Sequence, residues 1–87
     1  MISDKNLKFF RDLVSAPSPS GFEAPAQKVV KTFLKEHADE ISQDVNGNLI
    51  AYKKGSGKLK VMVIGHADEI GMIVNYIDDA GYVYVKT

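Results

Sequence analysis

His66 and Asp68 are the two side chains whose types and spacing could carry chemistry. They follow an apolar run, Val61–Gly65. Residues at alternate positions of an extended chain point to the same side, so the Asp68 carboxylate can accept a proton from one nitrogen of the His66 imidazole. That contact fixes the tautomer and leaves the other nitrogen free for a metal ion. The pair predicts either a metal ligand with its orienting carboxylate or, without a metal, a histidine that is hydrogen-bonded at a strand end.

The other ionisable side chains of interest have simpler interpretations. Glu69 has the chemistry of a general base, but in an extended chain its side chain points away from the pair, so we expect a structural or solvated role. His37 lies at the end of a helical segment, which predicts a surface histidine near the negative pole of the helix dipole. Asp78 and Asp79 are expected to be turn residues, because aspartate bonds its own backbone in turns.

The apolar run in front of the pair predicts the strand that positions it. Leu59–Gly65 has almost no polar alternation at Val61–Ile64, which is typical of a strand buried on both faces. In α/β proteins, loops at the ends of central strands open into a crevice that binds ligands. Gly65 is expected to let another backbone or a ligand approach closely, and Gly71 to relieve strain as the chain leaves the site.

Two helices are predicted before residue 40. Ser3 can cap a helix that runs to about Val14, because its hydroxyl accepts from a free first-turn N–H group. The prolines of segment 15–21 then end that helix. A second helix begins near Glu23, since proline at position 25 is tolerated in a first turn. The expected apolar face of the first helix consists of Leu7, Phe10, Leu13 and Val14.

Hairpins follow the helices. Ile41–Val45 and Asn48–Tyr52 flank the dipeptide Asn-Gly at positions 46 and 47, which predicts a hairpin with a type I′ turn. Gly71–Ile77 and Tyr82–Lys86 are predicted strands joined by a four-residue loop. The fold class is therefore α/β, with two N-terminal helices before a mixed, largely hairpin-connected sheet.

Composition excludes several functional classes. The 87 residues form one domain or part of one, and 11 basic and 11 acidic side chains give a net charge of zero. That balance argues against a nucleic-acid binder that relies on phosphate neutralisation. The absence of cysteine excludes disulfide frameworks and thiolate zinc sites. Neither a signal peptide nor an apolar run of about 20 residues is present, so we expect a cytoplasmic protein without membrane contact.

Three segments together resemble one family, the dinuclear metal aminopeptidases that include tetrahedral aminopeptidase and glutamyl aminopeptidase. The segments are residues 16–23, residues 44–51 and residues 61–71, and the last contains His-Ala-Asp-Glu-Ile-Gly. Their order and separation are similar to the N-terminal quarter of the family. The resemblance covers nearly the whole chain, and some family members have been labelled endoglucanase or cellulase.

The resemblance implies a role for each member of the pair. His66 would bind one of two divalent ions directly, and Asp68 would orient His66. In the family, the general base and the remaining ligands lie downstream of the matching segments. A His-plus-carboxylate site suits Zn²⁺, Co²⁺ or Mn²⁺. The implied function is removal of N-terminal residues from peptide substrates.

Residues 1–87 are then expected to be the N-terminal portion of a metallopeptidase catalytic domain. A two-metal peptidase site needs about five protein ligands and a base. We therefore expect this chain alone to be inactive and to hold no metal ion tightly. Its unpaired strand edge and apolar face are expected to favour homo-oligomers.

Two alternatives to the peptidase interpretation are kept. In the first, the chain is a non-enzymatic interaction or oligomerisation module that pairs with a partner through its unpaired edge. In the second, it is a glycoside hydrolase, as the family's older labels suggest. Glycoside hydrolysis needs two carboxyl groups about 5–9.5 Å apart across a sugar cleft, and no acidic pair in the sequence is placed for that.

Overall fold

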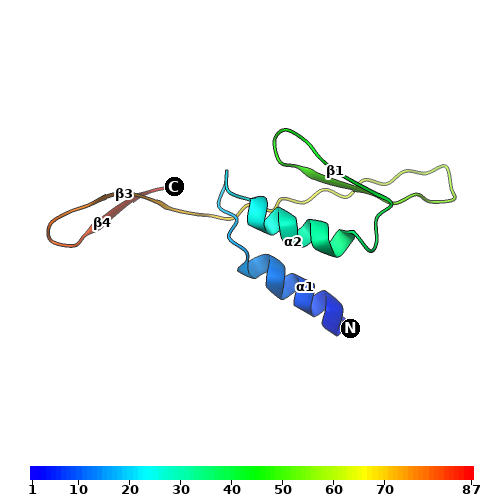
Figure 1. Cartoon of the computed structure of the whole chain (residues 1–87), viewed down its shortest axis with the longest axis horizontal. Helices are drawn as coiled ribbons and strands as arrows, with labels where there is room; N and C mark the ends of the chain where they lie inside the picture. The colour runs from blue at the N-terminus through cyan, green and yellow to red at the C-terminus, as the bar shows by residue number, and fades with distance from the viewer.

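The structure, a computed structural model, describes residues 1–87 as two helices followed by two β-hairpins (Figure 1). The helices are α1 (Asp4–Ser15) and α2 (Ala24–Leu34), and the strands are β1 (Glu40–Gln43), β2 (Leu49–Tyr52), β3 (Ile73–Ile77) and β4 (Val83–Lys86). Strand β1 pairs with β2 and β3 pairs with β4, both antiparallel, in two separate two-stranded sheets. The predicted α/β class with two leading helices is confirmed.

Helix α1 begins where the sequence predicts, but its aromatic contact with α2 comes from a residue outside the predicted apolar face. The Ser3 hydroxyl accepts from the Asn6 backbone N–H at 3.2 Å and caps the first turn. Phe10 and Val14 of the predicted apolar face are each 58% exposed. Phe9 instead stacks on Phe33 of α2, with ring centroids 4.0 Å apart. Leu7 and Leu13 of the predicted face are partly buried, so the prediction was wrong for Phe10 and Val14 and omitted Phe9. Apolar periodicity alone does not decide which side of a helix contacts a partner.

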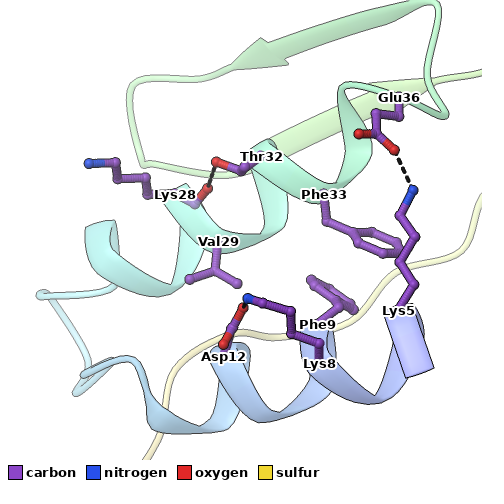
Figure 2. Close-up of a pocket in the computed structure, with 9 residues that line it drawn as sticks. All are labelled: Lys5, Lys8, Phe9, Asp12, Lys28, Val29, Thr32, Phe33 and Glu36. Atoms are coloured by element: carbon purple, nitrogen blue, oxygen red, sulfur yellow. Dashed lines mark hydrogen bonds and ion pairs between the residues drawn. The ribbon is translucent and has the colours of Figure 1, made fainter.

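The sides of α1 and α2 that face each other line a groove between the two helices (Figure 2). Phe9 and Phe33 face each other across it, and ion pairs lie beside the rings. Lys5 pairs with Glu36, and Lys8 pairs with Asp12 one turn away on α1. The hydrogen bond from Lys5 lowers the pKa of Glu36. These pairs are solvent-exposed, so they add little to the aromatic contact that joins the helices.

The two hairpins share one loop design. The backbone N–H groups of Asn46 and Asn48 both donate to the Asp44 carboxylate at 2.9 Å, and the Gly47 N–H donates to the Asp44 carbonyl. Asp78 makes the same three contacts with its own loop, residues 79–82. Gly47 in the first loop and Gly81 in the second both have φ of 88°. Each loop is thus an aspartate-capped turn that closes on a left-handed glycine.

The predicted type I′ turn was therefore wrong. A type I′ turn requires positive φ at both central residues, and Asn46 does not have it, since no residue other than glycine does. The Asp44 side chain competes successfully for the loop N–H groups, so the strands separate earlier than the Asn-Gly signal indicates. As a result, β1 ends at Gln43 and β2 begins at Leu49.

The predicted buried strand at Leu59–Gly65 is also wrong. This segment is not a strand, and its large apolar side chains are 78–92% exposed. It crosses the molecule from the β1–β2 hairpin towards β3 as an unpaired stretch (Figure 1). A strand exists only where a neighbour accepts its backbone hydrogen bonds, and no strand within residues 1–87 pairs with this segment.

The core is small and lies near the helices. Ala26 is fully buried and Ser18 is 5% exposed, and these are the only buried residues. The radius of gyration is 17.6 Å, against about 12 Å for a compact domain of this length. The β3–β4 hairpin extends away from the helices (Figure 1). Neither helix has the length and apolar character of a membrane span.

Candidate functional site

The segment that carries His66 is tied to the loop between the two helices. Pro19 and Glu69 form an isolated parallel bridge, although they lie far apart in the sequence. The Glu69 N–H donates to the Ser18 carbonyl at 2.8 Å, and the Ser18 N–H donates to the Glu69 carboxylate at 3.2 Å. Gly71 lies directly against Pro19, so closely that an added Cβ would collide with the proline ring. This clasp holds two otherwise irregular segments together.

The clasp places Ser20 beside Asp68. Ser20 lies in a turn that is closed by the Phe22 N–H donating to the Pro19 carbonyl at 2.8 Å, and Gly21 in that turn has φ of 88°. The Ser20 hydroxyl donates to Asp68 Oδ2 at 2.6 Å. That hydrogen bond is the main reason why the pKa of Asp68 lies below its ordinary value, and the contact with His66 adds to the effect. Asp68 is therefore ionised near neutral pH.

The surroundings of His66 assign its tautomer. Its Nδ1 lies 3.0 Å from Asp68 Oδ1 and 3.1 Å from the Asp68 backbone carbonyl. An ionised carboxylate and a carbonyl oxygen can only accept, so Nδ1 must carry the proton. In the neutral ring, Nε2 then keeps its lone pair. The His66 side chain is 86% exposed, and that lone pair is open to a ligand.

His66 and Asp68 border an open hollow of about 430 Å³, which Ser20, Glu69 and Ile70 also line. The arrangement suits one metal bond from Nε2, with the carboxylate behind the ring fixing its orientation. It does not suit a serine nucleophile, because the Ser20 hydroxyl donates to Asp68 and not to the imidazole. The chemistry available at this hollow is therefore that of a histidine ligand.

The structure brings the predicted pair within hydrogen-bonding distance, and whether the two residues serve a metal stays a prediction. Glu69 lines the same hollow, but its carboxylate accepts from Ser18, which agrees with a structural role. His37 lies on Phe33, with ring centroids 5.0 Å apart, and takes no part in the site. Nowhere in residues 1–87 do three His, Cys, Asp or Glu side chains gather as a metal centre would need.

Sequence reasoning missed Ser18 and Ser20 and misplaced the role of one glycine. Within residues 1–87 no other backbone approaches Gly65, since a Cβ there would meet nothing within 4 Å, whereas Gly71 makes such an approach to Pro19. The approach of a ligand to Gly65 stays a prediction. Ser20 lies 48 residues before Asp68, and its Ser-Pro-rich surroundings are typical of any turn. The only signal was that this loop belongs to one of the three family-like segments.

The chain is similar to known aminopeptidases. Residues 47–87 match the family model described as M42 glutamyl aminopeptidase. A protein of Acetivibrio thermocellus, provisionally named an aminopeptidase, is 49% identical over 87% of this chain. Lysyl aminopeptidase of Pyrococcus furiosus is 42% identical over 90% of the chain. Escherichia coli K12 FrvX, also provisionally an aminopeptidase, is 33% identical over 94% of it. The chain spans 22–23% of the length of these relatives.

Proposed function

Because this chain belongs to the M42 glutamyl aminopeptidase family, we propose that it is the N-terminal part of a metal-dependent aminopeptidase that removes N-terminal residues from peptides. The observation that carries the proposal is the His66–Asp68 pair within the family-matched residues, with Nδ1 held and Nε2 open. The aminopeptidase names of the relatives support the same reaction class.

The proposed enzyme uses two divalent metal ions, and His66 would hold one of them through Nε2. The residues present fit one ligand of such a centre, because the exposed His66 imidazole has its carboxylate partner on Nδ1 and no cluster of three His, Cys, Asp or Glu side chains accompanies it. When bound, the two metal ions would supply Lewis acidity to the scissile carbonyl and would lower the pKa of bound water. Zn²⁺, Co²⁺ and Mn²⁺ all suit a histidine and carboxylate ligand set. Asp68 keeps the His66 ring in the ligating tautomer.

The general base of this reaction is proposed to lie outside residues 1–87. Glu69 is the obvious acidic neighbour of the pair, but its carboxylate already accepts the Ser18 N–H. This hydrogen bond and the one from Ser20 to Asp68 argue against a glycoside hydrolase, since both neighbouring carboxylates are already engaged. We accordingly propose that the 87-residue chain alone has no measurable turnover and holds no metal ion tightly.

A second candidate is an interaction module, favoured by one observation. The apolar run Leu59–Ile64 lies exposed and unpaired, which is the kind of backbone that another strand can extend. This property is compatible with the peptidase proposal, since the enzyme is also proposed to be a homo-oligomer. We propose a cytoplasmic protein with peptide substrates and without nucleic-acid or membrane partners, which fits its zero net charge.

The decisive experiment compares His66→Ala with His37→Ala in the full-length protein. His66→Ala should remove one bound metal ion per subunit and most of the aminopeptidase activity, because Ala offers no ligand. The matched control, His37→Ala, removes an imidazole that only contacts Phe33 and should retain both metals and turnover. Metal content by atomic emission and hydrolysis of aminoacyl anilides are the two measurements. Full metal content and full activity in His66→Ala would end the proposal.

A further inference from the structure

The Asp68 carboxylate is held at both oxygens by different partners. Oδ1 lies 3.0 Å from His66 Nδ1, and Oδ2 accepts the Ser20 hydroxyl at 2.6 Å. A carboxylate with one contact can still rotate about its Cβ–Cγ bond, because that torsion is soft. Two contacts on opposite oxygens fix the plane of the group. The direction in which Asp68 presents Oδ1 to the imidazole therefore depends on Ser20.

The position of the Ser20 backbone is fixed by the loop between α1 and α2, and not by the segment of His66 and Asp68. The turn from Pro19 to Phe22 is closed by a backbone hydrogen bond of 2.8 Å. The preceding residue, Ser18, is 5% exposed and exchanges two hydrogen bonds with Glu69, one through its carbonyl and one through its N–H. With the backbone fixed on both sides, only the χ1 torsion sets the position of the hydroxyl oxygen. Its proton goes to Asp68 because an ionised carboxylate is a strong acceptor.

We propose that Ser20 is a positioning residue that holds Asp68 so that the His66 ring keeps Nδ1 protonated and turns Nε2 towards a metal ion. This inference rests on the proposed aminopeptidase function. In this role Ser20 acts through Asp68, to which its hydroxyl donates. Without that hydroxyl, the Asp68 carboxylate is free to rotate. The imidazole then keeps only the Asp68 backbone carbonyl, a weaker acceptor than an ionised carboxylate, to fix its tautomer and orientation.

The test uses Ser20 variants of the full-length protein. Ser20→Ala removes the hydroxyl, Ser20→Thr keeps it, and Ser56→Ala is a matched control because Ser56 is exposed in a polar turn and makes no side-chain hydrogen bond. The first readout is the pair of ¹⁵N shifts of the His66 ring in metal-free protein, which report the tautomer. The second readout is the affinity of the metal-free protein for Co²⁺, followed by its visible absorption.

Ser20→Ala is expected to mix the two His66 tautomers and to weaken Co²⁺ binding about 10–100-fold, the usual loss when the partner of a ligating histidine is disturbed. Ser20→Thr should restore both readouts, and Ser56→Ala should match the unmodified protein. A Ser20→Ala protein with unchanged ring shifts and unchanged affinity overturns the proposal. So does a variant that melts earlier but, once folded, retains both readouts, since that result marks a purely structural serine.

The outcomes separate this inference from the proposed function. If His66→Ala loses a metal ion but Ser20→Ala does not weaken binding, the role of Ser20 is wrong and the aminopeptidase assignment stands. If His66→Ala keeps both metal ions and full activity, the assignment itself is wrong. If Ser20→Ala does not fold, Ser20→Cys replaces it, because a thiol preserves the size of the side chain and donates only weakly. Ser20→Cys should then fall between Ser20→Thr and complete loss, and behaviour identical to the unmodified protein overturns the proposal.

Discussion

At the scale of single residues, aspartates fix geometry in two ways in this chain. Asp44 gathers backbone and side-chain donors of its own loop within four positions. Asp68 accepts one hydrogen bond from the ring of His66, two positions away, and one from the hydroxyl of Ser20 in the loop between the helices. In both cases the ionised carboxylate is the organising group, since it can accept several hydrogen bonds at once. The protonation of these groups therefore controls local structure.

The first prediction concerns Asp44 and pH. The hydrogen bond from the Asn48 side chain, together with those from loop N–H groups, lowers the pKa of Asp44 in the folded hairpin. A lowered folded pKa means that this stabilisation is complete above the unfolded pKa of about 3.9 and disappears as the pH falls through the folded value. The amide shifts of Asn46 and Asn48 should hold steady from neutral pH to about pH 4 and change below it. NMR titration of the chain measures this.

The control for the Asp44 prediction is Asp44→Asn. The amide side chain has a similar shape but does not titrate in this range, so the acid-dependent change in the two loop amides should vanish. A midpoint at or above the ordinary aspartate value in the unmodified chain would contradict the prediction, because it would mean that the loop does not favour the ionised form.

Of the two contacts made by the Asp68 side chain, only one could be predicted from the sequence. The His66–Asp68 contact was predictable because residues two apart in an extended segment share a side. The Ser20–Asp68 contact spans 48 positions and depends on the clasp between Ser18 and Glu69, which no local pattern encodes. The local contact that orients the imidazole was therefore predictable from the sequence. The contact from Ser20 was not, because it depends on tertiary structure.

At the scale of elements, caps and turns were more predictable than pairing. The helix starts follow from Ser3 and from a proline near the start of α2, because those signals act within one turn. Leu59–Gly65 has the composition of a buried strand, but strand formation needs a neighbour, and within residues 1–87 it has none. The choice between Phe9 and Phe10 as the contact to α2 was likewise decided by the partner helix.

The second prediction belongs to this scale and tests the clasp through Gly71. An added Cβ would overlap Pro19, so Gly71→Ala in the full-length protein should push residues 66–71 away from the helix-connecting loop. Overpacking of this kind costs about 1–3 kcal/mol of unfolding free energy. It should also lengthen the Ser20–Asp68 contact and disturb the His66 ring shifts. Denaturant unfolding and ¹⁵N NMR provide the two measurements.

Gly55→Ala serves as the comparison for Gly71→Ala. Gly55 does not need a positive φ, and a Cβ there meets nothing within 4 Å, so the same methyl group should leave stability within about 0.5 kcal/mol of the unmodified protein. If both variants behave alike, the loop and the His66 segment are not held together by that close approach.

At the scale of the whole molecule, the main feature is the number of apolar side chains that are exposed to solvent. The chain extends over 64 × 32 × 17 Å and has two buried residues, while most of its large apolar side chains face outward. Isolated two-stranded hairpins such as β3–β4 are marginal in water, and unpaired apolar segments invite pairing with other chains. A chain with this surface is expected to gain stability by association.

The last prediction is that the 87-residue chain self-associates through Leu59–Ile64. Its mass by light scattering should rise with concentration, because the unpaired backbone of this segment can pair with another chain and its apolar side chains can be buried there. Val63→Lys places a charge in that segment and should shift the chain towards monomer. Val45→Lys makes the same change at a similarly exposed position in the loop between β1 and β2, outside both strands and outside Leu59–Ile64, so it should leave association intact. A chain that stays monomeric at high concentration, or one for which both lysines dissolve the assembly equally, would show that this segment does not drive association and would remove the main support for the interaction-module alternative.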